Sequence, residues 1–312
     1  MKYLKTIEEY QGQNRTAITL GKFDGLHRGH QKLINAVAEK VANMQVSTVE
    51  VISSVVFAFD MMNLHKELGK STQQIMLKEE RVKHLEGQVD YLIDCQFDNE
   101  IRHMSAEEFI RTILVEKFRV KYIVVGEDFH FGYKALGNAA MLEQYAEEYN
   151  YSVEIIEQEM YQEQVISSSY IKSCIRNGEL TKVNDMLGYE YSIIGEVIHG
   201  KKLGRKLGFP TMNIVPSKEK LLPPFGVYTI SVKIGDQFCN GIANVGKKPT
   251  VEANGLPQVE TYVFDYEGDA YGENIEVYFQ HFQRSEKKFN SVELLKRQVE
   301  EDIQEARNIA LL

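Results

Sequence analysis

The hydrophobic pattern divides the chain into two parts, and the first runs from residue 16 to about residue 188. Short apolar runs, typical of strands buried on both faces, span 16–20, 47–57, 89–97, 121–126 and 151–157. Between them, helical spacing of apolar residues recurs over 30–44, 105–118, 138–149 and 168–176. This alternation predicts an α/β domain built on a doubly wound parallel sheet with helices on both faces.

Local sequence signals define the apolar face or the end of three of these predicted helices. The first carries on one face the apolar residues Leu33, Ile34, Val37 and Val41. The second opens with Ser105 and Glu108 at capping-box spacing, and its apolar face consists of Phe109, Ile110, Ile113 and Leu114. The helix over 168–176 is expected to stop at Asn177-Gly178.

After Tyr189 the pattern changes to close strand-like pieces separated by Gly, Pro and Asn turns. These pieces span 191–199, 226–235, 237–246, 258–266 and 274–282, and they predict an antiparallel β-sandwich or barrel. One helix closes the chain, beginning at Asn290 with Glu293 in capping position. Its apolar face, which we expect to pack across the barrel, consists of Leu295, Val299, Ile303, Ala306 and Ala310. We place the boundary near 184–190 and predict domains over 1–186 and 187–312.

Composition supports two differently built regions. The chain has 312 residues, enough for two domains, and all six prolines fall between Pro210 and Pro257. No apolar run approaches a membrane span, and the first residues lack the apolar core of a signal peptide, so we expect a cytoplasmic protein. Cys95, Cys174 and Cys239 have no metal-ligand spacing and are interpreted as free thiols.

The first candidate site is the segment GKFDGLHRGH at 21–30, between the first strand and the first helix. Ligands bind at the carboxyl ends of strands in open α/β sheets, and a helix N-terminus there attracts phosphate. Gly21, Gly25 and Gly29 would let a phosphate approach the backbone, while His27 and His30 would donate hydrogen bonds to its oxygens. A metal site and a turn with incidental histidines are the alternatives.

The second candidate site is the basic, glycine-rich segment HGKKLGRKLGFPTMN at 199–213. Gly200, Gly204 and Gly208 predict a flap whose backbone amides surround a polyphosphate. The oxygens of Thr211 and Asn213 suit Mg²⁺ or another divalent cation. Nucleic-acid binding is the alternative, which the net charge of -9 and the lack of interleaved aromatic residues disfavour.

Both segments resemble motifs of one enzyme family. The pattern GxFDGxHxGH is found in the nucleotidylyltransferase superfamily, and in this form it is similar to the prokaryotic bifunctional riboflavin kinase/FAD synthetases. GEDFHFG at 126–132 and ISSSYIK at 166–172 resemble two further motifs of their adenylyltransferase module. The second site resembles their kinase signature GxxxGRxxGFPTAN, with Met212 in place of Ala. Later family positions match at 226–228, 244–250, 260, 271–272 and 284–289.

The resemblance implies a Rossmann-like adenylyltransferase domain, a β-barrel kinase domain and a role for each matching residue. Glu260 would be the general base of the kinase, although strand alternation alone would place it on a solvent face. His27, His30 and Lys172 would offset phosphate charge during adenylyl transfer. ATP and phosphate would be bound by Gly21, Phe23, Gly25, Gly29, Ser167, Ser168, Ser169, Gly200, Gly204, Arg205, Lys206, Gly208, Pro210 and Thr211. Flavin would be bound by Asp128, Phe129 and Arg284.

We therefore predict a bifunctional enzyme that converts riboflavin and ATP to FMN, then FMN and ATP to FAD and pyrophosphate. Its partners would be small molecules, with neither nucleic acid nor membrane, and its oligomeric state is left open. Departures from the family lie mainly in the first module: Ser169 and Lys172 replace Thr and Arg, and residues 56–63 lack a TFxPHP-like segment. Two alternatives follow, a kinase with a weakened adenylyltransferase and a flavin-binding regulator without turnover.

Overall fold

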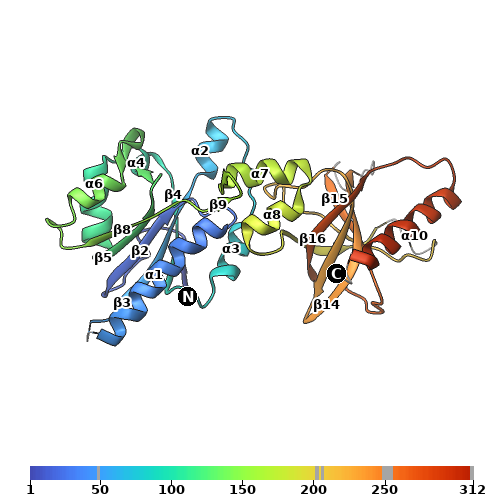
Figure 1. The fold of residues 1–312 in the computed structure, drawn as a ribbon, viewed down its shortest axis with the longest axis horizontal. Coiled ribbons are helices and arrows are strands. Elements are labelled where there is room, and N and C mark those ends of the chain that lie inside the picture. The colour runs from blue at the N-terminus through green and yellow to red at the C-terminus, as the bar shows by residue number, and fades with distance from the viewer. Residues whose placement is uncertain (48–49, 201–203, 205–206, 248–255, 310–312) are drawn as a thin grey trace. The chain divides into compact units, whose positions relative to one another are not determined.

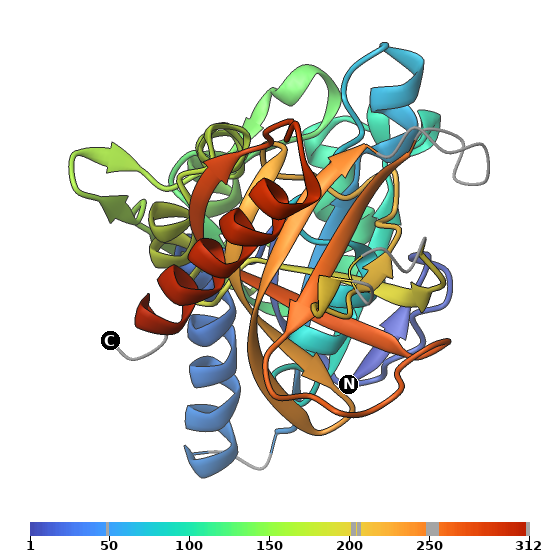
Figure 2. The same cartoon turned by 90° about the vertical axis from the view of Figure 1, so that its right-hand side faces the viewer.

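The computed structural model describes residues 1–47, 50–200, 204, 207–247 and 256–309, and Figures 1 and 2 show it from two sides. Contacts divide the chain into two units, Met1–Ser168 and Ser169–Leu312. The domain boundary predicted from the sequence, between residues 186 and 187, lies further along the chain than this division and stays a prediction.

The first unit is built on an open sheet with the strand order β1-β4-β3-β2-β5-β8, in which every neighbouring pair is parallel. Its strands are β1 (Lys2–Leu4), β2 (Arg15–Gly21), β3 (Ile52–Asp60), β4 (Tyr91–Gln96), β5 (Val120–Gly126) and β8 (Ser152–Ile156). Its helices are α1 (Arg28–Ser47), α2 (Met62–Glu67), α3 (Lys78–Leu85), α4 (Asn99–His103), α5 (Ala106–Glu108), η1 (Phe109–Lys117), η2 (Tyr133–Ala135) and α6 (Ala139–Gln144). Two short hairpins complete it, β6 (His130–Phe131) with β7 (Gly137–Asn138), and β9 (Met160–Tyr161) with β10 (Gln164–Val165).

The topology of this sheet places a ligand crevice beside β2. From β2 the chain passes through α1 to β3, and it later returns to the other side of β2 as β5. The order reverses at β2, and the carboxyl edge at such a switch point is where open α/β sheets bind ligands. The prediction of a doubly wound α/β unit is confirmed (Figure 1).

Helices cover both faces of the sheet because they bury the predicted apolar residues. On one face, α1 packs against β2, β3 and β5 and buries Leu33, Ile34, Val37 and Val41. On the other face, Phe109, Ile110, Ile113 and Leu114 join a core cluster with alternate residues of the strands. The Ser105 side chain caps this second helix by accepting a hydrogen bond from Glu108 N (3.1 Å), as its spacing predicts.

The structure differs from the predicted elements at several places. α1 continues to Ser47, so β3 begins at Ile52 rather than at residue 47. The predicted helix over 138–149 is regular only over Ala139–Gln144. The second helix changes from α5 into the π-helix η1, and β1 is an edge strand with no counterpart in the prediction.

The second unit is a closed antiparallel barrel with the strand order β11-β12-β15-β14-β13-β16. Its elements are α7 (Ser168–Asn177, beginning at the last residue of the first unit), α8 (Leu180–Leu187), β11 (Ser192–Ile198), β12 (Met212–Ile214), β13 (Gly226–Ile234), β14 (Gln237–Lys247), β15 (Pro257–Val263), β16 (Asn274–Ser285) and α10 (Val292–Ile309). Gly178 follows α7 with φ 76°, so the predicted stop is confirmed.

The last helix packs on the barrel as expected, with its cap one residue later than predicted. Ser291, rather than Asn290, accepts a hydrogen bond from Leu294 N (3.2 Å). Ala306 is buried against Val227, Ile242 and Phe264, with Val299 and Ile303 beside them. Figure 2 shows α10 in red across the orange strands. Ala310 lies outside the described residues.

Candidate active sites

The loop between β2 and α1 has a tight, strained backbone. Phe23 and Leu26 are buried with positive φ values of 49° and 39°. Gly25 has φ 90°, and a Cβ there would lie 2.9 Å from the Ile75 side chain. Asp24 Oδ1 accepts hydrogen bonds from the backbone of Ile75 (2.9 Å) and Met76 (3.3 Å). Such strain persists only where the surroundings enforce it, and it is frequent at ligand sites.

His27 and His30 lie together at the end of this loop, where α1 begins. Their rings stack with centroids 3.6 Å apart. A Cβ at Gly29 would lie 3.3 Å from the His27 ring, so glycine allows the close approach. Within the described part of the chain, neither Nδ1 atom has a hydrogen-bond partner. Burial lowers the pKa of His27 to about 4 and the pKa of His30 well below its usual range, so both imidazoles are neutral at pH 7.

Two further predicted segments reach the same crevice. Asp128 follows β5 and is near enough for its carboxylate to oppose the lowering of the His27 pKa. Phe129 packs against the core and stacks on Phe131 at 5.6 Å. From the serine motif, Ser168 Oγ donates a hydrogen bond to Asp24 O (2.8 Å). Ser169 and Lys172 lie on α7 in the second unit.

The structure also places charged residues here that sequence reasoning missed. Glu159 pairs with Arg28 (2.5 Å) and with Lys32, both on the first turns of α1. Its backbone oxygen accepts from Ile166 N (2.8 Å), which connects the serine motif to the histidine loop. A second missed pair joins Arg81 of α3 to Asp94 of β4. The sequence contained one signal of these charged contacts, the i, i+4 spacing of Arg28 and Lys32, which places both side chains on one face of α1.

The second site is centred on the ladder of β12, β15 and β14. Asn213 pairs with Glu260 across β12 and β15, and Glu260 pairs with Asn244 on β14. Thr211 Oγ1 donates a hydrogen bond to Glu260 Oε1 (2.7 Å). Thr211 and Glu260 are half-buried and Asn213 is buried. Three predicted residues, up to 49 positions apart in the chain, therefore meet at one place.

Glycines of the predicted flap pack directly on these side chains. A Cβ at Gly200 would collide with the Asn213 amide, and one at Gly204 would lie 3.2 Å from Thr211 Oγ1. Phe209, which precedes Pro210, donates from its backbone to Gly204 O (2.8 Å), and Gly208 has φ 92°. The flap thus approaches the polar pair as closely as only glycine permits. The basic residues Arg205 and Lys206 lie outside the described residues.

Arg284, predicted to bind flavin, makes a different set of contacts here. Its Nε and Nη2 donate to the buried Asp302 carboxylate at 2.8 and 2.6 Å, and its Nη1 donates to Ser285 O (3.2 Å). These bonds connect β16 to α10. The structure therefore assigns Arg284 a tethering contact, and flavin binding by this residue stays a prediction.

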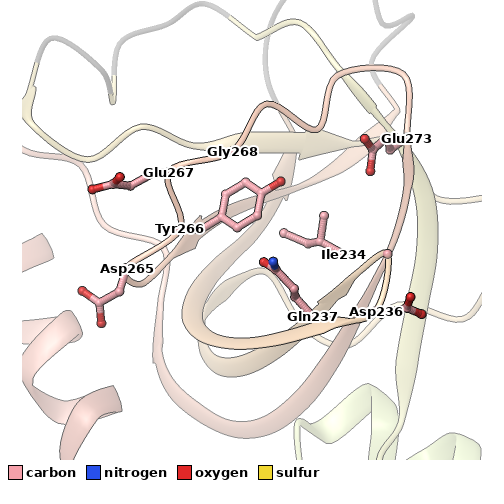
Figure 3. Close-up of a pocket in the computed structure, with 9 residues that line it drawn as sticks. Ile234, Asp236, Gln237, Asp265, Tyr266, Glu267, Gly268 and Glu273 are labelled. Carbon is pink, nitrogen blue, oxygen red and sulfur yellow. The ribbon is translucent and has the colours of Figure 1, made fainter.

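An open cavity of about 570 Å³ lies at another part of the barrel, lined by residues 234–237, 265–268 and Glu273. Figure 3 shows its carboxylates spread around the rim, with Tyr266 and Ile234 between them. No group of three or more His, Cys, Asp or Glu suited to a metal occurs among the residues that the structure describes. Hence this cavity has no converging ligand set.

Comparisons with known proteins agree for both parts of the chain. The FAD synthetase family model matches residues 9–170, and the riboflavin kinase family model matches residues 187–310. A bifunctional riboflavin kinase/FMN adenylyltransferase from Haemophilus influenzae is 36% identical over 295 residues, which covers 93% of each chain. One of the same name from Listeria monocytogenes is 33% identical and covers 97% of this chain and 94% of its own.

A solved structure shares the fold over nearly the whole chain. It is named a macrolide-efflux protein from Streptococcus pneumoniae, with a TM-score of 0.86, 29% identity and 98% of each chain covered. That name describes the other protein. In the part of this chain that the structure describes, every helix is too short or too polar to cross a bilayer.

Proposed function

Since the chain belongs to the family of bifunctional riboflavin kinase/FMN adenylyltransferases, we propose that the two sites described above each carry out one of its reactions. The enzyme makes FMN from riboflavin and FAD from FMN, with ATP and flavins as substrates. The observation that carries the assignment is that both predicted motifs assemble into polar clusters, His27 with His30 and Thr211 with Glu260. Each cluster is bordered by glycines, whose lack of a side chain lets the backbone approach it closely.

In the kinase reaction, Glu260 acts as general base. The 5′-oxygen of riboflavin forms a bond to the γ-phosphorus of ATP, the bond from that phosphorus to the bridging oxygen breaks, and ADP leaves. Glu260 takes the proton of the 5′-hydroxyl, and the hydroxyl of Thr211 orients its carboxylate. The flap at Gly200, Gly204 and Gly208 surrounds the polyphosphate. Phosphoryl transfer needs positioning more than covalent chemistry, which this arrangement supplies.

The oxygens of this cluster fit a divalent cation. Thr211, Asn213 and Glu260 offer a hydroxyl, an amide and a carboxylate, the hard oxygen ligands that Mg²⁺ prefers. We propose that Thr211 and Asn213 hold Mg²⁺ there. The ion would neutralise charge on the phosphates of ATP.

In the adenylyltransferase reaction, a phosphate oxygen of FMN forms a bond to the α-phosphorus of ATP. The bond to the oxygen that bridges the α- and β-phosphates breaks, and pyrophosphate leaves. His27 and His30, as neutral imidazoles, each offer one N–H donor to phosphate oxygens. Gly21, Phe23, Gly25, Gly29 and the serines form the binding loop, and Asp128 and Phe129 border the flavin. The role of Lys172 rests on its motif alone.

The cytoplasm remains our proposal for the compartment. Cys95 and Cys174 are buried free thiols, which is usual for proteins of a reducing compartment.

The test is to supply riboflavin and FMN separately with Mg-ATP and to measure both products by chromatography. Wild type should form FMN and then FAD. Glu260→Gln should slow FMN formation about 100-fold or more, because general-base catalysis contributes at least that much, and should leave FAD formation from FMN unchanged. Glu196→Gln removes an exposed strand carboxylate and serves as the control.

Loss of both activities in Glu260→Gln would contradict separate sites. Wild-type protein that makes FMN but no FAD from supplied FMN would leave a kinase without adenylyl transfer. Binding of flavin without either product would indicate a regulator.

A further inference from the structure

A buried ion pair joins α3 to β4 near enough to the two histidines for its positive charge to act on His30, and no residue role assigned above uses it. Arg81 is 6% exposed and Asp94 is 2% exposed. Arg81 Nη2 donates to Asp94 Oδ1, and the Tyr3 hydroxyl donates to Asp94 Oδ2 (2.7 Å). Moving two charges out of water costs free energy that their attraction repays only in part. A pair placed here therefore calls for a reason other than stability.

The strand register aligns this pair with the histidine loop. Asp94 is opposite Ala58, and Ala58 is opposite Gly21, the residue at which β2 ends. Ile93 and Cys95 belong to the core under η1, so Asp94 points to the other face, which α1 covers. The residue between, Ala58, has only a methyl side chain. No side chain larger than this methyl group therefore stands between Asp94 and Gly21 in that row of paired residues.

The Arg81 guanidinium keeps a donor available. Its Nε is buried and has no hydrogen-bond partner within the described residues. Its charge also lowers the pKa of His30, as the third cause after burial of the imidazole and the charge of His27. The carboxylates of Asp24 and Asp128 act on the other member of the pair, His27. The positive charge of Arg81 thus acts on His30, whereas the two carboxylates act on His27.

The chemistry of adenylyl transfer is favoured by positive charge near the reacting phosphates. The FMN phosphate and the ATP phosphates are anions, and negative charge concentrates on the α-phosphate as pyrophosphate leaves. Two neutral imidazoles donate hydrogen bonds but do not neutralise that charge. A fixed cation with its counter-ion held behind it is preorganised for the transition state.

We propose that Arg81 is a positioning residue of the adenylyltransferase site that provides fixed positive charge beside His30, with Asp94 and Tyr3 fixing its guanidinium. This inference rests on the proposed adenylyl transfer. The charge orients the phosphates toward the imidazoles and adds to the burial that keeps His30 in its neutral form, in which one nitrogen donates and the other accepts.

The experiment measures FMN adenylylation by the full chain in three variants. Arg81→Met should lower kcat about 100-fold while the KM values for FMN and ATP change little, because the interaction strengthens in the transition state. Arg81→Lys keeps the charge and should recover part of the loss. Arg81→Met with Asp94→Asn removes the whole pair, so no unpaired buried charge remains to disturb folding, and should be as slow as Arg81→Met.

Lys83→Met is the matched control, because it removes a cation from an exposed position of the same helix. It should keep wild-type kinetics, and all variants should keep riboflavin phosphorylation. The rate-pH profile adds a readout that a structural role would not move. Without the Arg81 charge the pKa of His30 rises, so the acidic limb of the profile shifts to higher pH.

Three results would overturn the proposal while leaving the adenylyltransferase assignment intact: wild-type kcat in Arg81→Met, recovery of kcat in the double variant, or equal losses in Arg81→Met and Lys83→Met. Wild-type protein that forms no FAD from FMN would overturn the assignment itself and the role of Arg81 with it.

Discussion

The stacked imidazoles of His27 and His30 are uncharged hydrogen-bonding groups at neutral pH. Burial is the largest cause of their lowered pKa values, and for His27 it outweighs the opposing carboxylates of Asp24 and Asp128. A neutral imidazole has one donor and one acceptor. At the scale of single residues, the pair would therefore orient phosphate oxygens in the proposed reaction, and positive charge would have to come from other side chains.

His27 also makes stability depend on pH. Its pKa is about 4 in the folded protein and about 6.5 in an unfolded chain, so the unfolded state binds more protons between these values. The free energy of unfolding should therefore fall as pH drops from 6.5 toward 4, by about 3 kcal/mol from this residue.

His27→Gln removes the titrating group, so its first-unit transition in urea should depend less on pH than that of wild type. Equal pH dependence in the two proteins would show that His27 is not buried as described.

Some site residues can be predicted from sequence because their types and spacing carry the chemistry. His27, His30, Gly25 and Gly29 stand in one short loop between a strand and a helix. Arg81 and Glu159 are different, since their meaning depends on burial and on partners distant in the chain. Hydrophobic periodicity contains no information about which charges become buried together.

At the scale of elements, the long and periodic segments were predictable and the short ones were not. β1 and β12 have three residues each, too few to show an alternation of apolar and polar side chains, and β12 follows a glycine-rich flap. The change from α5 to the π-helix η1 leaves the buried face intact, so the apolar pattern does not reveal it. The end of α1 and the start of β3 differ from prediction because residues 47–51 contain no breaker.

The tether between β16 and α10 predicts an element-scale effect on stability. Asp302→Ala should lower the free energy of unfolding by about 3 kcal/mol, because it leaves the Arg284 guanidinium without its carboxylate in a mostly buried position. Glu301→Ala, one residue earlier, removes an exposed partner of Arg297 and should change stability by less than about 0.5 kcal/mol.

Thermal denaturation of the two variants measures this contrast. Similar midpoints would mean that the Arg284–Asp302 pair adds little to the attachment of α10.

At the scale of the whole molecule, the change of hydrophobic pattern near Tyr189 predicted two architectures, and the structure has both. The clustering of all six prolines between Pro210 and Pro257 also has a structural meaning. The described prolines occupy connections of the barrel, apart from Pro257, which is the first residue of β15. The open sheet of the first unit offers loops at strand ends for adenylyl transfer, whereas the barrel brings side chains together across its ladder.

The edge strand β1 has a consequence for self-association. Lys2–Leu4 covers the backbone N–H and C=O groups on one side of β4, and an uncovered strand edge is a template for pairing with another molecule. Removing residues 1–4 should therefore cause concentration-dependent aggregation, visible by light scattering, that adding salt does not suppress. A monodisperse truncated protein would contradict this expectation. The three residues of β1 thus protect the edge of β4 from pairing with strands of other molecules.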